Sequence, residues 1–493
     1  MRVLKSMSTR IVCALAALML PLGAEAHGFG RLYNLPVPFW LYAWAATAAL
    51  VLSFLLVAFF ASAPKAASPP STRDISHAGW VRALRRLLPA LKLFSVLLLL
   101  LCIATALFGN RDPFRNFSMT FFWVVFLLGV TYLTALVGDF YAVLNPWRVM
   151  TDALGRVVRG YARGRVPYRA SWGDWPALLL YLTFIWFELF GLGRPVPLAK
   201  LLLAYSALNI VGVWLVGSAA WFRHCEFFAV FLRLVGLMAP LDYRRGAAGE
   251  RGSLHLRMPF AGLVQQRPES LGTVLFALAM LSTTAFDGLR ATQSWVYLFW
   301  SDPTGLVTAL AGARPVAVYA SLRSWYLGWE TFWLITSPFL YLAAYLACIA
   351  LAKCLTRSPR PVRELALDFG FTLLPIAFVY HLTHYATLML TQGLKIVSLA
   401  SDPFGWGWNL FGTATLLKAP ILPSMGLVWH AQVGLILFGH IASVYVAHLV
   451  ALRVWPTRRS ALLSQLPMLA LMVLFTVAGL WIIAQPLTTE SMR

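Results

Sequence analysis

Residues 87–108 read LLPALKLFSVLLLLLCIATALF, an apolar stretch whose only charged residue is Lys92. As an α-helix this stretch would be about 33 Å long, enough to cross the roughly 30 Å hydrocarbon core of a bilayer. Nine other stretches have the same length and character. The ten predicted spans are 39–61, 87–108, 119–138, 175–193, 199–220, 270–289, 329–352, 366–390, 427–450 and 463–485.

The composition supports a membrane protein. Of the 493 residues, 60% are hydrophobic and only 12% are charged. A soluble globular chain has about 25% charged residues, and a disordered chain has low hydrophobicity. The composition therefore excludes both a soluble multi-domain enzyme and intrinsic disorder, and the fold class that we predict is an all-α, polytopic membrane helix bundle.

The amino terminus has the three parts of a secretory signal peptide. Arg2, Lys5 and Arg10 precede an apolar run at 11–23, and Ala24-Glu25-Ala26 forms an A-x-A cleavage site. The apolar run is too short to span a bilayer comfortably. We predict that 1–26 is a cleaved signal peptide and that 27–493 is a single transmembrane domain. An uncleaved anchor is the alternative.

The formal net charge of +22 follows the predicted topology. With residue 27 placed outside, 26 of the 40 Lys and Arg fall in the predicted inside segments, and each of these has more basic residues than either outside neighbour. This is the positive-inside rule. We therefore expect a cytoplasmic face on an anionic leaflet, no nucleic-acid partner, and both mature termini outside. The inside segments are 62–92, 139–174, 221–269, 353–365 and 451–462.

One predicted inside segment is itself apolar. Residues 221–238 read WFRHCEFFAVFLRLVGLM and include Arg223, Glu226 and Arg233. Charged residues interleaved with large apolar ones are typical of a helix that lies in the plane of the membrane interface. We predict such an interfacial helix here.

Ionisable residues inside a membrane mark candidate functional sites, because their burial is costly. On the predicted spans they gather in the outer half of the membrane. The mature amino terminus, His27, lies on the same side. The set comprises Glu188, Asp287, Glu330, His381, His384, His430 and His440.

These residues suggest three kinds of site. His381 and His384 are spaced to share one helix face, and His430 or His440 on the next span could meet them. Three neutral imidazoles with a carboxylate such as Asp287 would bind zinc, manganese or copper with a position left for water. Ordinary polar packing is the second interpretation. The third is a bis-histidine haem between His381 and His440, as in a b-type cytochrome.

Two further features extend these hypotheses. An amino-terminal His27 could chelate copper through its amine and its ring, or it could be an ordinary residue left by cleavage. Residues 401–412 read SDPFGWGWNLFG and place Trp406 and Trp408 between the two histidine-bearing spans. This segment could cover a pocket for an aromatic ligand, with Tyr385 beside it, or it could belong to an interfacial aromatic belt.

The chain resembles the bacterial integral-membrane fenitrothion hydrolases. Four segments carry the resemblance: AHGFGRLYNLPVPFWLY (26–42), GDFYAVLNPWR (138–148), AFDGL (285–289) and VYHLTHYATLMLTQGLKIVSLASDPFGWGWNLFG (379–412). The resemblance implies an aryldialkylphosphatase-type enzyme of the bacterial inner membrane that hydrolyses phosphorothioate triesters. It implies no particular catalytic residues.

The residues and the resemblance together give one main hypothesis. A metal held by His381, His384 and His430 or His440 would activate water, and Asp287 would be a fourth ligand or the base. Glu188 and Glu330 would assist, and an apolar substrate would arrive through the lipid. The alternatives are a carrier or metal-handling protein and the cytochrome. Nothing in the sequence indicates the oligomeric state.

Overall fold

The structure is a computed structural model, and its described part is almost entirely helical. Residues 1–24 of the predicted signal peptide and the carboxyl-terminal residues 486–493 lie outside it, so the cleavage and the side of the carboxyl terminus stay predictions. The described residues are 25–28, 31–34, 38–60, 72–191, 193–244, 252–419, 421 and 424–485.

Nine helices of the described part are long and apolar enough to cross a membrane, which confirms a polytopic membrane helix bundle. The sequence predicted ten. The difference is the segment 175–193, which forms only the 12-residue helix α9 (Trp175–Trp186) followed by the five-residue π-helical turn η5 (Phe187–Gly191). The nine are Phe39–Phe59, Gly79–Phe108, Phe117–Val137, Pro195–Val216, Leu271–Arg290, Pro315–Thr356, Val362–Ser401, Met425–Val454 and Arg458–Ala484.

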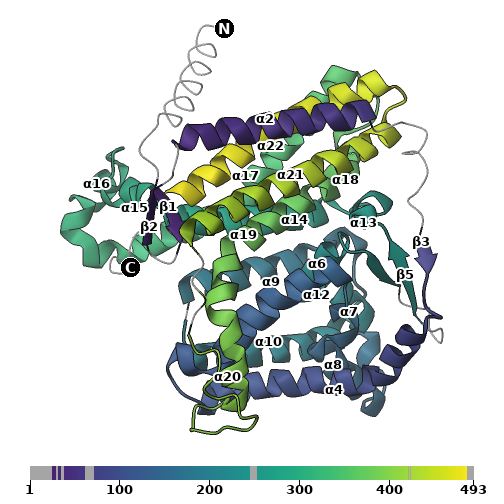
Figure 1. Cartoon of the computed structure of the whole chain (residues 1–493), viewed down its shortest axis with the longest axis vertical. Helices are drawn as coiled ribbons and strands as arrows, with labels where there is room; N and C mark the ends of the chain where they lie inside the picture. Colours follow the sequence, from purple (N-terminus) through teal and green to yellow (C-terminus); the bar gives the residue numbers. More distant parts are fainter. Residues whose placement is uncertain are drawn as a thin grey trace.

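The helices form two groups that pack side by side (Figure 1). The first group consists of α2 (Phe39–Phe60), α14 (Leu271–Arg290), α17 (Tyr319–Thr356), α19 (Leu374–Gln392), α21 (Met425–Val454) and α22 (Arg458–Ala484). The second consists of α4 (Gly79–Phe108), α5 (Phe117–Met119) continuing through the π-helix η2 (Thr120–Val130) into α6 (Thr131–Val137), α8 (Pro146–Val157), α9, α10 (Pro195–Val216) and α12 (Phe227–Gly236). Helices α14 and α19 contact α9, α12 and η2, so these elements make the boundary between the groups.

Short elements cap the two ends of the bundle. Helices α15 (Gln293–Trp300) and α16 (Leu306–Ala311) lie at one end, and an antiparallel sheet of β3 (Thr72–Asp74), β5 (Ser253–Arg257) and β4 (Leu241–Arg244) lies at the other (Figure 1). The sequence placed these segments on opposite sides of the membrane. The remaining elements are β1 (Glu25–Gly28), β2 (Arg31–Asn34), η1 (Pro113–Arg115), α7 (Tyr141–Leu144), η3 (Tyr161–Arg163), η4 (Ala170–Trp172), α11 (Ser218–Ala220), η6 (Trp221–Cys225), α13 (Ala261–Gln265), η7 (Pro315–Val318), α18 (Val362–Phe369), η8 (Gly370–Leu373), η9 (Gly393–Lys395) and α20 (Ile396–Ser401).

Burial separates central from peripheral helices. In the most apolar 18-residue window, 83% of the residues of α14 are buried, against 11% in α4. The span that contains α19 reaches 78%. The helices that carry Asp287, His381 and His384 are therefore the central ones, whereas α4 presents most of its side chains to the surroundings, as a lipid-facing helix does.

The interfacial helix predicted at 221–238 is wrong. Eight of the ten residues of α12 are buried, whereas an interfacial helix would leave one face exposed. Its Arg233 pairs with the buried Asp174, whereas Arg223, in the preceding turn, pairs with Glu269 at the exposed surface. Helix α12 therefore belongs to the interior of the bundle.

A close approach between α19 and α21 depends on Gly439. A Cβ atom at Gly439 would lie 2.2 Å from Cγ2 of Val379, closer than real carbon contacts allow. We expect Gly439→Ala to destabilise the protein by about 1–3 kcal/mol, because the helices must separate. Unfolding in detergent would measure this. Gly434→Ala is the matched control on the same helix, since a Cβ there meets nothing within 4 Å; equal stability of the two variants would contradict the prediction.

Candidate functional site

Four polar side chains meet at the boundary between the two helix groups. His384 Nε2 lies 2.7 Å from Asp287 Oδ2, and a carboxylate there accepts the ring N–H. The Tyr385 hydroxyl lies 3.1 Å from Glu188 Oε1 and 3.3 Å from Asp287 Oδ2. One hydroxyl proton thus stands between two carboxyl groups. We call Glu188, Asp287, His384 and Tyr385 the polar cluster.

Three separate elements position the polar cluster. Glu188 lies in the π-helical turn η5 at the end of α9, Asp287 in the last turns of α14, and His384 and Tyr385 on α19. Single π-helical turns within helices are frequent at functional sites. Because η5 belongs to one helix group and α14 and α19 to the other, the Tyr385–Glu188 hydrogen bond crosses the boundary between the groups.

Arg290 extends the cluster toward the end of the bundle. Its Nη1 lies 3.8 Å from Asp287 Oδ1, and its Nε donates to Glu330 Oε1 at 3.2 Å. The guanidinium also lies over the ring of Phe190, 4.7 Å from its centroid. Arg290 and Glu330 are buried, with 8% and 4% of their surface exposed. All three carboxylates predicted as catalytic therefore belong to one connected set of polar groups.

A small cavity opens on the polar cluster. Its volume is about 20 Å³, room for about one water molecule. Glu188, Asp287, Tyr385 and His381 line one part of it, and the rest is lined mainly by apolar and aromatic residues of η2, α9, η5 and α12, with two threonines of α14. A water molecule held there would touch carboxylate oxygens, which can accept its protons.

A larger cavity lies on the far side of Arg290. Its volume is about 580 Å³, within the range of small-molecule sites. Arg290, Glu330 and Arg323 supply its charged groups. Its aromatic lining consists of Phe190, Trp300, Tyr319 and Tyr326. We call it the aromatic cavity, and it could hold an apolar aryl compound with a polar end against Arg290.

The predicted histidine ligands do not converge. His381 Nδ1 has no hydrogen-bond partner, although the ring lines the small cavity. His430 is exposed and His440 is fully buried, and each lies within hydrogen-bonding distance of a carbonyl of its own helix. His27 pairs with Leu32 between β1 and β2 through the backbone.

The geometry therefore does not fit the predicted metal centre. Among the residues that the structure describes, no group of three or more His, Cys, Asp or Glu side chains could hold a metal ion. Of the predicted histidine ligands, His384 is the one whose ring the structure pairs with a carboxylate, and it uses Nε2 for Asp287. The ring of His440 packs against Tyr380, and that of His381 against Tyr132, Phe231 and Tyr385. Each of the two rings proposed as haem ligands therefore packs against protein side chains, and His440 Nδ1 lies 2.8 Å from a carbonyl of its own helix.

The predicted tryptophan lid lies elsewhere. Trp406 and Trp408 are 57% and 41% exposed, and neither lines the small cavity or the aromatic cavity. Asp402 shapes their loop by accepting hydrogen bonds from the backbone N–H groups of Trp406 and Gly407 at 2.9 and 2.8 Å. Tyr385, the third residue predicted to bind substrate, is instead the bridge between the two carboxyl groups.

Arg290 is the residue of the site that sequence reasoning missed. It directly follows the predicted span 270–289, so the sequence places it at the start of an outside loop. The signal was present, because Arg290 follows Asp287 by three residues and shares its helix face once the predicted span 270–289 is extended by one residue. The aromatic residues of 290–328 carried no comparable signal, since their cavity depends on how α15 folds against α17.

Comparison with known proteins does not add a relative. No protein family matches the chain, and no curated protein or solved structure matches it significantly. The function has to be argued from the polar cluster and the two cavities.

Proposed function

We propose that this chain is a membrane-embedded hydrolase of apolar aryl dialkyl phosphate or phosphorothioate triesters. One observation carries the proposal: Asp287, hydrogen-bonded to His384, lines a water-sized cavity one helical turn from Arg290, which lines an aromatic cavity. The resemblance to fenitrothion hydrolases supports the same chemistry. We further infer that the protein resides in the inner membrane of a bacterium with this site toward the periplasm.

The proposed reaction needs only groups of this chain and water. Asp287 accepts a proton from the water in the small cavity, and the oxygen of that water forms a bond to phosphorus. The bond from phosphorus to the aryl oxygen breaks, and the phenol leaves as a phenolate. His384 and Tyr385 orient Asp287. Arg290 stabilises the negative charge that develops on the phosphoryl oxygen or sulfur.

The location suits the substrate. A neutral triester partitions into the bilayer, where it is more concentrated than in water. The aromatic cavity lies at the end of the bundle between η5, α15 and α17, so its ligand need not cross the whole membrane. A nitrophenolate is a good leaving group and needs little protonation as it departs. This agrees with a site whose carboxylates can accept protons and in which no residue is assigned to protonate the leaving group.

The test is hydrolysis of a chromogenic nitrophenyl triester by the purified chain in detergent and in vesicles. Trp300→Ala removes one aromatic side chain from the lining of the aromatic cavity. We expect KM to rise about tenfold with little change in kcat, because the substitution weakens substrate binding and leaves the groups that act on phosphorus intact. Trp325→Ala is the matched control: Trp325 lies on α17 beside cavity residues, is 49% exposed and does not line the cavity. No nitrophenol release by the wild type would refute the hydrolase.

The second candidate is a proton-coupled carrier. The hydrogen bond between Tyr385 and Glu188 joins the two helix groups, so a change of protonation at Glu188 could loosen that boundary. The same vesicles distinguish the two functions. A carrier would move protons across the vesicle membrane when a transported solute is added, without releasing nitrophenol, whereas a hydrolase would release nitrophenol with no dependence on a pH gradient.

A further inference from the structure

A large basic cavity lies at the end of the bundle opposite the polar cluster. Its volume is about 990 Å³, and it opens between α8, η6, α12, the sheet and α21. We call it the basic cavity. Its charged lining consists of six guanidinium groups, Arg148, Arg223, Arg233, Arg244, Arg257 and Arg453, against two carboxylates, Asp139 and Asp242.

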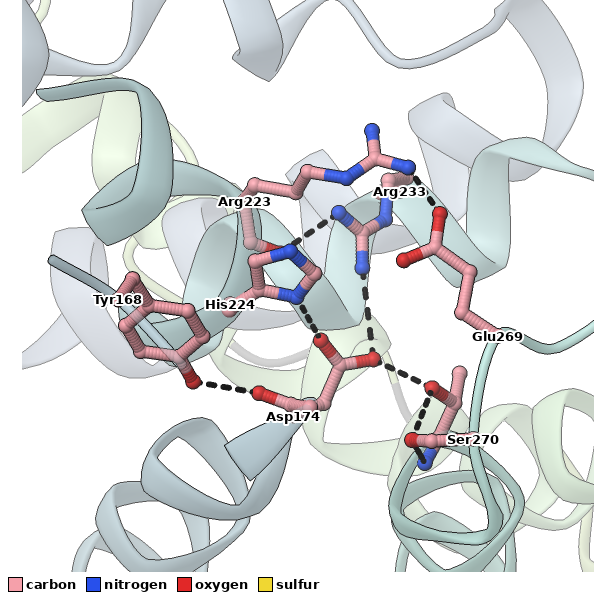
Figure 2. A network of polar contacts seen from close by, with 9 residues as sticks. Tyr168, Asp174, Arg223, His224, Arg233, Glu269 and Ser270 are labelled. Atoms are coloured by element: carbon pink, nitrogen blue, oxygen red, sulfur yellow. Dashed lines mark hydrogen bonds and ion pairs between the residues drawn. The ribbon is translucent and has the colours of Figure 1, made fainter. Parts of the chain in front are cut away.

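Two of these arginines have carboxylate partners behind the cavity wall (Figure 2). Arg223 pairs with Glu269, and Arg233 lies 3.7 Å from Asp174 Oδ2. Asp174 is shared, because it also lies 2.7 Å from His224 Nδ1 and accepts a hydrogen bond from Thr273 at 2.6 Å. Although burial alone would raise its pKa, these partners hold the pKa of Asp174 below its usual value. One carboxylate therefore interacts with three cationic or polar side chains at once.

Asp242 is shared in the same way. Its carboxylate lies 2.9 Å from Arg244 Nε and 3.5 Å from Arg257 Nη1. Arg257 is only 4% exposed, and its Nη1 makes no hydrogen bond. Arg148 lies over the ring of Phe222 at 5.2 Å and forms no ion pair with any described residue.

The charge balance at the basic cavity is positive. Counting the partners behind the wall, four carboxylates face six guanidinium groups. Burial raises the pKa of Asp139 to about 6, so this carboxylate loses its charge only as the pH falls below neutral. The positive-inside rule explains arginines on an exposed cytoplasmic surface, but it does not explain why they converge on the wall of a cavity.

A second cavity continues the basic one toward α4. Its volume is about 550 Å³, and it shares Ala142, Arg148 and Tyr243 with the basic cavity. Arg85, Lys92 and Arg156 add positive charge, whereas Asp152 is its only acid. The rest of its wall is mostly apolar and comes from α4, most of whose residues are not buried, and from α7 and α8. Arg148 stands where the polar and apolar regions join.

We propose that the basic cavity binds a phosphate-bearing anion, either the head group of an anionic phospholipid or a soluble phosphate ester. Guanidinium groups bind phosphate through paired, charge-assisted hydrogen bonds, and basic pockets between membrane helices bind anionic lipid head groups. Arg148 contributes the guanidinium that no carboxylate neutralises. The apolar continuation along α4 would accommodate an acyl chain. This site is independent of the proposed hydrolase.

The experiment measures the thermal unfolding midpoint of the full chain in neutral detergent with added phosphatidylglycerol, phosphatidylcholine or inorganic phosphate. We expect phosphatidylglycerol to raise the midpoint and phosphatidylcholine to leave it unchanged. Arg148→Gln should weaken the apparent affinity about fivefold, the effect of one basic residue near an anionic lipid. High salt should reduce the shift, because the attraction is electrostatic.

The matched control is Arg159→Gln. Arg159 is exposed, belongs to the same predicted inside segment and lines neither cavity. It should retain the wild-type affinity. Arg148→Lys keeps the positive charge but not the paired donors of the guanidinium, so its apparent affinity for phosphatidylglycerol should lie between those of the wild type and Arg148→Gln. If inorganic phosphate raises the unfolding midpoint as much as phosphatidylglycerol does, the site is assigned to soluble phosphate esters. Equal effects of phosphatidylglycerol and phosphatidylcholine with none from phosphate, or equal affinities of Arg148→Gln and Arg159→Gln, overturn the proposal.

Discussion

Asp287→Asn is expected to lower the rate of triester hydrolysis by about 10²–10⁴-fold, the usual contribution of a positioned general base. The amide cannot accept the proton of the attacking water. The loss should appear in kcat, because Asp287 lines the water-sized cavity and not the aromatic cavity. Nitrophenol release by equal amounts of folded variant and wild type in detergent gives the measurement.

Two further variants make this result specific. Asp112→Asn changes an acid that is 45% exposed and lines neither the small cavity nor the aromatic cavity, and it should retain the wild-type rate. His384→Gln keeps a donor toward Asp287 but not the ring, so we expect a smaller loss than in Asp287→Asn. If Asp287→Asn retained most of the activity, Asp287 would not be the base and the proposed mechanism would be wrong.

The acids of the site could be predicted from the sequence, whereas the histidine ligands could not. Glu188, Asp287 and Glu330 each interrupt an apolar run, and burial of a carboxylate is costly enough that such residues find partners. The spacing of His381 and His384 also predicted correctly that both lie on one helix. Their partners depend on which helices are neighbours. Helix α14 supplies Asp287 to His384, His381 Nδ1 has no hydrogen-bond partner, and His440 lies within hydrogen-bonding distance of a carbonyl of its own helix.

The fold, like the site, could be predicted from the sequence only in part. Hydrophobic length identified the long helices, because a span must satisfy its backbone internally across the hydrocarbon core. The segment 221–238 was misplaced because its charges looked solvent-directed in the sequence. Arg233 instead reaches Asp174, which lies 59 positions earlier in the chain, directly before α9 (Figure 2). A distant partner of this kind leaves no local pattern.

Glu226→Ala is expected to destabilise the protein by about 3–5 kcal/mol, the largest stability effect that we predict. Glu226 is fully buried and is the N-cap of α12, where its carboxylate accepts the N–H groups of Phe228 at 3.1 Å and Ala229 at 2.8 Å. It also accepts Asn145 Nδ2 at 3.0 Å and the Tyr205 hydroxyl. Alanine would leave these four donors buried without an acceptor.

Unfolding by denaturant in mixed micelles would measure the loss, and two variants define its origin. Glu226→Gln keeps one acceptor oxygen and should lose less than Glu226→Ala. Glu269→Ala breaks an ion pair in which both side chains are 56% exposed, so it should cost about 0–1 kcal/mol. Because Phe227, Phe228 and Phe231 of α12 line the small cavity, loss of this cap should also loosen the wall that faces Asp287. Equal stabilities of Glu226→Ala and Glu269→Ala would mean that the buried cap does not hold α12 in the bundle.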